Sequence, residues 1–540
     1  MKIKILILCL FFPLSNLVAQ SIPYLKKQGT ATQLIVNKKT FLILGGELGN
    51  STAADSVKIK NIFPQLKAGN LNTVLAPVYW ELTEPAEGSF DFSLVDVLIR
   101  EARNEDLKLV LLWFGSWKNS MSCYAPAWVK NNRKRFPYVE KSDGKTVEIM
   151  SAFSEENLNT DKKAYTALMQ HIKDIDSQEN TVIMMQVENE IGMIPEAREY
   201  GKTADNWFKS DVPAELINYL KANRANLHPK LLDKWALSGY AAKGNWETLF
   251  GSDIYTEELF QAWHFARYAD NIARAGKSIR NLPVFVNAAL NTRDRKPGAY
   301  PSGGPLPHLS DIWRAGAPSI DFIAPDIYDP PFDDWCRQYH VNGNPLFIPE
   351  TQRGNHTAAR VFYAFGEHDA MGFCPFSVES TDNPPDEPLR KSYDLLNQLS
   401  PLLASVQGKN MTKGCWLRPE NLQETIESGD FVFHFSHDYT LSWSPGNKEA
   451  KEHWPEAGAL IIRLSDNEFI VAGTGVVIRP ELKKQSEKHS VGLLSCDKGK
   501  FENGIWISTQ RLNGDETHQG RHVRIPWGDF DIQRVILYRY

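Results

Sequence analysis

The sequence is poor in cysteine. It has 6 cysteines in 540 residues, and no two of them are spaced as C-x-x-C. Zinc knuckles need such close pairs, and disulfide-rich folds need a dense, even set of cysteines. We therefore expect neither a metal knuckle nor a disulfide framework, and we expect packing roles for most of the cysteines.

Long apolar runs are absent beyond the N-terminus. No later segment approaches the roughly 20 apolar residues that a transmembrane helix needs, so we predict no membrane span. The N-terminus has Lys2 and Lys4, a mostly apolar stretch over 5–17, and tolerable residues before a cut near Gln20. This pattern is typical of a secretory signal peptide. We predict a signal peptide over residues 1–20 and a protein that is periplasmic or secreted.

An excess of positive charge is also missing. The formal net charge is -5, whereas nucleic-acid-binding domains carry basic patches, so we expect no nucleic acid partner. In contrast, the chain has 15 Trp and 18 Tyr. Sugar rings pack their C–H faces on aromatic planes, so this composition fits a carbohydrate partner, although large cores use the same residues.

Eight short apolar runs alternate with longer amphipathic segments. The runs lie at 41–49, 72–80, 107–115, 181–190, 282–290, 320–328, 344–351 and 372–380. Such alternation predicts an α/β fold in which helices connect parallel strands. Eight units predict a (β/α)8 TIM barrel over residues 21–404. A doubly wound open sheet is the alternative, but no glycine-rich phosphate loop follows the first run.

The pattern changes near residue 405. From there on, short runs of alternating apolar and polar residues are separated by turn residues, which is typical of an all-β domain. We predict a smaller C-terminal β-sandwich over 405–540. This domain either braces the barrel or binds glycan.

Polar and aromatic residues gather where the eight runs end. These residues are Glu47, Trp80, Trp117, Asn119, Glu188, Asn189, Glu190, Asn287, Asp326, Tyr328, Glu350 and Glu379. In a barrel, the carboxyl ends of all strands meet at the mouth that carries the active site. The set contains no histidine, which disfavours a hydrolytic zinc site. The chain also lacks the G-x-S-x-G elbow of serine hydrolases. We therefore predict no metal and no cofactor.

Two glutamates across a sugar-sized pocket suit glycoside hydrolysis. That reaction needs one protonated carboxyl to release the glycosidic oxygen and one carboxylate to attack the anomeric carbon. Glu190 on the fourth strand and Glu350 on the seventh lie across the predicted mouth from each other. By this reasoning alone, either residue can take either role.

Strand alternation separates the residues at the end of the fourth run. Glu188 and Glu190 share one face of a regular strand, and Asn189 points to the other. We expect Glu188 to be a structural carboxylate one layer below Glu190. For Asn189 to reach the pocket as well, the strand must bulge there, and Gly192 would permit it.

The stretch "MMQVENEIG" (184–192) resembles the "QVENEYG" motif of glycoside hydrolase family 35, the retaining β-galactosidases. The segment 69–92 and "PAW" at 126–128 also resemble that family, and the chain is similar to family 42 of the same clan. The resemblance covers roughly residues 30 to 400. It implies a (β/α)8 barrel that cleaves β-galactosides with two glutamates.

The resemblance also assigns roles to residues. It implies that Glu190 is the acid/base, Glu350 the nucleophile, Asn189 the partner of the sugar 2-hydroxyl, and Tyr328 a neighbour of the nucleophile. The chain departs from the family at Pro77 and in "WKNS" (117–120), so the sugar pocket is rebuilt. We predict that the sugar is bound by Glu47, Trp80, Trp117, Asn119, Asn189, Asn287 and Tyr328.

These observations predict an exo-acting retaining β-galactosidase without cofactor. Relatives of this architecture include enzymes that trim β-galactosyl side chains from plant polysaccharides such as xyloglucan. One alternative is a retaining β-glycosidase for another sugar, such as a glucoside, glucuronide or arabinoside. The other is a non-catalytic carbohydrate-binding protein, which the two intact glutamates disfavour. The oligomeric state stays open.

Overall fold

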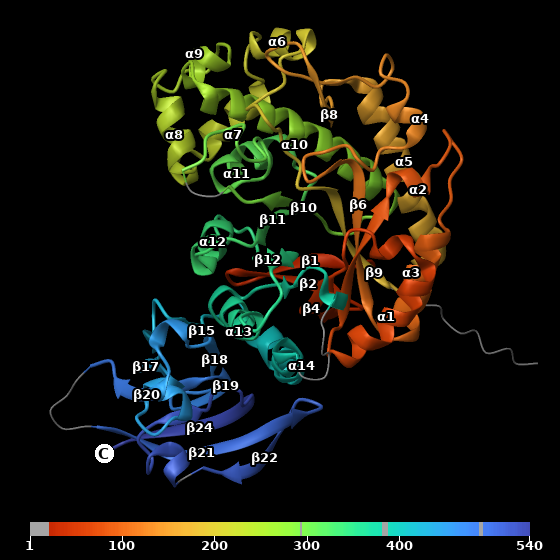
Figure 1. The fold of residues 1–540 in the computed structure, drawn as a ribbon. Helices are drawn as coiled ribbons and strands as arrows, with labels where there is room; N and C mark the ends of the chain where they lie inside the picture. Colours follow the sequence, from red (N-terminus) through yellow and green to blue (C-terminus); the bar gives the residue numbers. More distant parts are fainter. Residues whose placement is uncertain (1–20, 292–293, 381–386, 485–489, 513) are drawn as a thin grey trace, which may run out of the picture.

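The computed structural model describes residues 21–291, 294–380, 387–484, 490–512 and 514–540 (Figure 1). The predicted signal peptide over residues 1–20 lies outside the described residues. No helix of the described part is long and apolar enough to cross a membrane.

A parallel sheet closes on itself to form the predicted barrel. The hydrogen-bonded order is β12-β14-β4-β5-β6-β9-β10-β11-β13. The two end strands, β12 and β13, are halves of one segment separated by Pro349, so eight strand positions complete the circle. The strands are β4 (Ile43–Glu47), β5 (Thr73–Tyr79), β6 (Lys108–Lys118), β9 (Val182–Asn189), β10 (Val284–Ala289), β11 (Phe322–Ile327), β12 (Phe347–Ile348), β13 (Glu350–Thr351) and β14 (Gly372–Phe373). The predicted fold class is confirmed.

The barrel strands are buried almost throughout, because helices cover them outside and side chains fill them inside. Strands β5 and β9 are buried at every position. Such two-sided burial explains why they read as continuous Val, Ile, Leu and Met runs rather than as alternating patterns.

A helix follows each barrel strand before the next one begins. These helices are α1 (Ser56–Ala68), α3 (Ser93–Asn104), α5 (Glu155–Asp176), α10 (Ile254–Ile279), α11 (Ser310–Gly316), α12 (Phe332–Tyr339), α13 (Thr357–His368) and α14 (Pro388–Val406). Aspartates start two of them: the side chain of Asp55 accepts the first free N–H groups of α1, and that of Asp253 does so for α10. Such caps satisfy donors that have no partner within the helix.

Two long insertions follow β6 and β9, as their sequence lengths predict. The first holds α4 (Ala127–Lys130) and the hairpin β7 (Tyr138–Glu140) and β8 (Thr146–Met150). The second holds α6 (Lys202–Phe208), α7 (Ala214–Ala222), α8 (Pro229–Ala236) and α9 (Trp246–Phe250). A short helix, α2 (Trp80–Thr83), follows β5 directly.

Two local features differ from the sequence prediction. Residues before the first barrel strand form an antiparallel sheet of β1 (Tyr24–Gln28), β2 (Ala31–Val36) and β3 (Lys39–Thr40). Strand β14 ends at Phe373, so Glu379 lies on a 3-10 turn rather than at a strand end. Its carboxylate accepts the Gly49 N–H at 3.0 Å, so it ties the eighth connection to the first.

The C-terminal region is the predicted sandwich of two antiparallel sheets. One sheet has the order β15-β18-β19-β24-β21-β22 and the other β16-β17-β20-β23. The strands are β15 (Thr412–Leu417), β16 (Gln423–Ser428), β17 (Phe431–His437), β18 (Ala457–Arg463), β19 (Glu468–Thr474), β20 (Val476–Leu482), β21 (Val491–Glu502), β22 (Ile505–Arg511), β23 (Val523–Ile525) and β24 (Asp531–Arg539). Phenylalanines such as Phe433 and Phe469 fill the space between the sheets.

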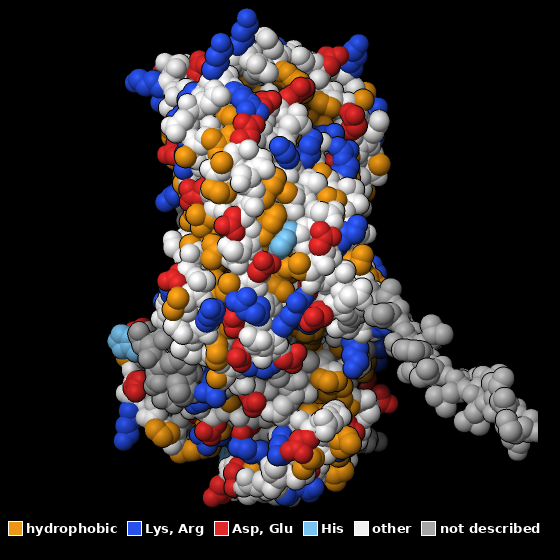
Figure 2. Space-filling model, turned by 90° about the vertical axis from the view of Figure 1, so that its right-hand side faces the viewer, with side chains coloured by type: hydrophobic (Ala, Val, Ile, Leu, Met, Phe, Trp, Pro, Cys, Tyr) orange, Lys and Arg blue, Asp and Glu red, His pale blue; other side chains and the backbone are white. Residues whose placement is uncertain are grey.

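The sandwich packs against α13 and α14 of the barrel (Figure 1). Glycines bring the backbones together, since a Cβ on Gly366 of α13 would lie 2.7 Å from the Lys413 carbonyl oxygen. On the face drawn in Figure 2, basic and acidic side chains are interspersed without an extended basic area.

Candidate active site

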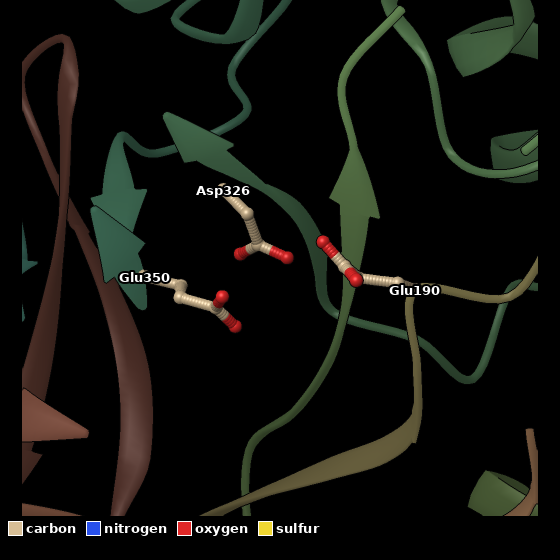
Figure 3. A group of neighbouring side chains, drawn as sticks. All are labelled: Glu190, Asp326 and Glu350. Carbon is tan, nitrogen blue, oxygen red and sulfur yellow. The ribbon is translucent and has the colours of Figure 1, made fainter. Parts of the chain in front are cut away.

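Three carboxyl groups meet at the carboxyl ends of the barrel strands. Glu190 follows β9, Asp326 lies near the end of β11, and Glu350 begins β13. One oxygen of each lies within 4.8 Å of the others, and all three residues are buried. Figure 3 shows their side chains pointing toward one another from different strands. The two glutamates singled out in the sequence, 160 positions apart, are therefore neighbours.

The end of β9 has an unusual backbone that brings three consecutive polar residues into the interior. Glu188 and Glu190 have φ angles of 59° and 46°, a left-handed conformation that is uncommon for residues other than glycine. Because of these two turns, Glu188, Asn189 and Glu190 are all buried. The predicted bulge exists, but the glutamates form it rather than Gly192.

Glu190 is held from two sides. The Asn119 side-chain amide donates to its carboxylate, and its backbone N–H donates to Asn287 Oδ1 at 3.0 Å. Burial raises the pKa of Glu190, while the charge of Lys118 and a hydrogen bond with Asp326 act in the opposite direction. Burial is therefore the cause that favours the protonated form of this side chain.

Glu350 has a different set of neighbours. The Tyr328 hydroxyl donates to its Oε1. Burial and the charge of Glu190 raise the pKa of Glu350 to about 7, while Lys118 and the Tyr328 hydrogen bond lower it. The group therefore changes charge close to neutral pH.

Two further acids surround this pair. Asp326 accepts a hydrogen bond from Asn287 Nδ2 at 2.6 Å, and Glu47 is fully buried at the end of β4. Burial, followed by the charge of Glu350, raises the pKa of both groups well above the ordinary carboxyl range. Burial and the neighbouring negative charge therefore favour the protonated forms of Asp326 and Glu47, which can donate hydrogen bonds.

Lys118, at the end of β6, is a site residue that the sequence reasoning missed. Its side chain is only 4% exposed, and Nζ donates to Asn189 Oδ1 at 3.0 Å. Its charge lowers the pKa of Glu47, Glu190 and Glu350. The feature that could have revealed it is a lysine at the end of an apolar strand. It lies within residues 117–120, where the chain departs from the family pattern.

A second layer of acids lies beneath the site, as expected for Glu188. Its Oε2 accepts the Trp117 backbone N–H at 2.8 Å. Burial and the neighbouring Asp161 raise the pKa of Glu188 well above its usual range. Asp161 in turn accepts from Trp113 Nε1 at 2.8 Å and from the Ser116 hydroxyl. Asp161 could not be identified from the sequence, because it lies inside helix α5.

Two of the predicted sugar-binding residues, both tryptophans, have their rings packed against side chains outside the acidic cluster. The Trp80 indole is fully buried, donates to Glu84 and packs on Trp128. The Trp117 ring is also fully buried and packs against Phe265 and Tyr268 of α10. The geometry gives no support to a sugar contact by either tryptophan. Asn287 links Glu190 to Asp326, as described above, so its carboxamide orients acids.

Several buried polar atoms at the mouth have no hydrogen-bond partner among the described residues. They are Glu47 Oε1 and Oε2, Gln186 Oε1, Asn189 Nδ2, Asp326 Oδ1 and Glu350 Oε2. Buried polar groups are normally paired. A cluster of unpaired donors and acceptors around two carboxylates therefore suits a ligand rich in hydroxyl groups.

Carboxylates this close could also coordinate a hard divalent cation, which prefers oxygen ligands. In this site, however, Asn119, Asn287 and Tyr328 donate hydrogen bonds to the same three groups. Buried Lys118 adds a positive charge beside them. Each of the three acids is therefore held by a hydrogen-bond donor, and a positive charge acts on the site.

Two family models match separate parts of the chain. Residues 33–230 match glycosyl hydrolases family 35, and residues 389–524 match a domain of unknown function. The first match contains Glu190 but ends before Glu350. No curated protein matches the chain.

Solved structures similar to the chain include three β-galactosidases. The enzyme from Rahnella sp. R3 is 15% identical, with a TM-score of 0.46 over 71% of this chain and 58% of that one. The enzyme from Bacillus circulans sp. alkalophilus is 15% identical, with a TM-score of 0.45 over 67% and 57%. The enzyme from Halorubrum lacusprofundi is 13% identical, with a TM-score of 0.43 over 66% and 58%. The chain thus spans less than two thirds of the length of each. The predicted resemblance to glycoside hydrolase family 35 is confirmed by the family model over residues 33–230.

Proposed function

We propose that this protein is an exo-acting retaining β-galactosidase. The observation that carries the proposal is the meeting of Glu190 and Glu350, whose nearest carboxyl oxygens lie within 4.8 Å. Retaining glycosidases keep their two carboxyl groups about 5–5.5 Å apart, whereas inverting enzymes need about 6.5–9.5 Å to admit a water molecule. The short separation favours retention.

The reaction proceeds by two displacements at the anomeric carbon. Glu350, ionised, attacks that carbon, while Glu190, protonated, gives its proton to the departing glycosidic oxygen. The bond to the aglycone breaks as the galactosyl–Glu350 ester forms. Glu190 then removes a proton from water, which attacks the same carbon and releases the sugar with its original configuration.

The environments of the two glutamates fit these roles. Burial raises the pKa of Glu190, which favours the protonated form that the acid role needs. The Tyr328 hydroxyl and the charge of Lys118 both stabilise the ionised form of Glu350. Two carboxyl groups kept in different protonation states are the requirement of this chemistry.

The unpaired polar atoms around the pair provide sugar contacts. Asn189 Nδ2 faces the 2-hydroxyl in this proposal, and the Glu47 carboxyl group bonds a hydroxyl on the other side of the ring. Both groups are buried and lack partners among the described residues. The sugar supplies the missing hydrogen bonds, which gives the site its affinity for a hexose.

A panel of aryl β-glycosides tests the proposal. We expect the galactoside to be cleaved with a kcat/KM at least about tenfold above that of the glucoside, glucuronide and arabinoside. Preference for another sugar would keep the mechanism and change the specificity. No turnover of any member would favour the alternative, a non-catalytic carbohydrate-binding protein. Galactosylated oligosaccharides of defined linkage, xyloglucan fragments among them, then identify the polymer.

We also infer export, on the basis of the signal-like sequence over residues 1–20. The test is N-terminal sequencing of the mature protein from a host with a secretion pathway. A start near residue 21 supports export, and an intact N-terminus in the cytoplasm contradicts it.

A further inference from the structure

The end of strand β6 places a buried ammonium group against the asparagine of the site. Lys118 Nζ lies 3.0 Å from Asn189 Oδ1, and both side chains are buried, with Lys118 4% exposed. The Lys118 backbone also pairs with that of Asn189 across β6 and β9. The two side chains are therefore held together by their strands as well as by the hydrogen bond.

This contact determines which way the Asn189 carboxamide points. An ammonium group can only donate hydrogen bonds, so the atom facing it must be the amide oxygen. The Nδ2 group then points to the opposite side. It has no acceptor among the described residues, although a buried N–H group normally has one. Asn189 Nδ2 is therefore a buried hydrogen-bond donor without an acceptor among the described residues.

Lys118 is also the positive charge that faces the acids of the site. Its charge lowers the pKa of three carboxyl groups: Glu47 at the end of β4, Glu190 after β9 and Glu350 on β13. On its other side, the ammonium lies 5.0 Å from the centre of the Phe114 ring. A buried cation close to several carboxyl groups favours their ionised forms.

We propose that Lys118 is a positioning residue: it fixes the Asn189 carboxamide as a hydrogen-bond donor to the sugar 2-hydroxyl. The proposal rests on the proposed function, because it concerns the same site. Lys118 lies in the segment 117–120, where this chain departs from the family pattern.

The first test pairs a substrate change with a variant. Lys118→Met is assayed on an aryl β-galactoside and on its 2-deoxy analogue. We expect kcat/KM to fall about tenfold or more on the parent, since contacts to the 2-hydroxyl strengthen in the transition state. On the analogue, which lacks that hydroxyl, we expect a clearly smaller loss. Equal losses on the two substrates would overturn the orienting role.

The second test separates the hydrogen bond from the charge. In Lys118→Gln, an amide N–H can still donate to Asn189 Oδ1, but the positive charge is gone. We expect this variant to keep the preference for the substrate with the 2-hydroxyl. Loss of that preference in Lys118→Gln would overturn the role of the hydrogen bond. Lys118→Arg keeps both a donor and the charge, and should keep the preference as well.

A matched control lies on the same strand. Lys108 is at the opposite end of β6 and donates to the Glu179 carbonyl oxygen, so Lys108→Met should leave the substrate ratio unchanged. Thermal melting checks that each variant is folded, and Lys118→Leu, which also lacks a donor, replaces Lys118→Met if that variant is not. No turnover by the wild-type protein would overturn the proposed function itself. If the wild type is active and Lys118→Met loses kcat/KM equally on the two substrates, only the role of Lys118 is overturned.

Discussion

At the scale of single residues, two similar side chains have different neighbours. Glu190 and Glu350 are both buried glutamates with raised pKa values. Glu350 alone receives the Tyr328 hydroxyl, and Glu190 alone receives the Asn119 amide. These contacts are the basis on which we propose different roles for the two residues.

The pH dependence of activity follows from Glu350. Its pKa is raised to about 7, and it must be ionised to attack, so kcat/KM should fall as pH drops through about 7. The Tyr328 hydrogen bond lowers that pKa. Tyr328→Phe should therefore move the acidic limb to higher pH, besides lowering the rate. The measurement is kcat/KM across pH 5 to 9 on a good aryl substrate.

The control for this variant is Tyr538→Phe, because Tyr538 is exposed on the sandwich and its loss should leave the profile unchanged. A Tyr328→Phe limb at the wild-type position, or at lower pH, would show that the hydroxyl does not stabilise ionised Glu350.

The sequence was sufficient to identify the acidic pair and several of its neighbours, Asn119, Asn287 and Tyr328 among them, but not Lys118 or Asp161. Glu190 and Glu350 could be found because carboxylates at the ends of apolar strands are costly without a function. Lys118 and Asp161 could not, since a lysine or an aspartate in an ordinary strand or helix pattern is far more often a surface residue. Trp80 and Trp117 were expected to bind sugar because they lie at strand ends. Strand position does not reveal where a ring points, and both rings are buried in the core.

At the scale of elements, the end of β9 depends on a glycine. A Cβ on Gly192 would lie 2.5 Å from Pro301 Cβ, so the glycine lets the loop after β10 approach β9. Met193 and Ser302 exchange backbone hydrogen bonds beside this contact. The loop thereby supports the segment that carries Glu190.

Gly192→Ala should therefore reduce both stability and activity. Overpacking a tight contact costs about 1–3 kcal/mol, and the shift would move Glu190 as well. The measurements are chemical unfolding and kcat. At Gly201, in the same insertion, the nearest atom to an added Cβ is a side-chain oxygen of Glu199 at 3.2 Å. Gly201→Ala should cost about 0.5 kcal/mol or less; similar losses in both variants would contradict the account.

The barrel strands and the helices could be predicted at this scale because their patterns are long and repeated. The sheet of β1 to β3 could not, since its polar first strand has no apolar periodicity. The left-handed turns at Glu188 and Glu190 could not be located either, because tertiary contacts impose them on residues that rarely adopt them.

At the scale of the whole molecule, the sandwich has a core of its own and also contributes residues to the hydrophobic core of the barrel. Trp416, Leu460 and Ile470 of the sandwich belong to the same buried cluster as the barrel residues. Glu456 joins the two parts through Arg360, at 2.7 Å, and through Trp416 Nε1, at 2.6 Å. This packing supports the bracing role that was one of the two expectations for the domain.

The protein should therefore unfold in a single cooperative transition. Gly458→Val should lower its melting temperature without changing KM, because a Cβ there would lie 2.4 Å from the Ala359 carbonyl oxygen of α13. Scanning calorimetry is the measurement. Two separate transitions, with only the second affected by the variant, would contradict a shared core.

The central claim is that Glu350 forms a covalent bond to the sugar while Glu190 supplies the proton. The most direct test treats the protein with a 2-deoxy-2-fluoro glycosyl fluoride of the preferred sugar and maps the label by peptide mass spectrometry. The account predicts one added fluorosugar on the peptide that contains Glu350, and no label in Glu350→Gln. A label on another residue, or none under conditions where the parent glycoside is cleaved, would contradict it.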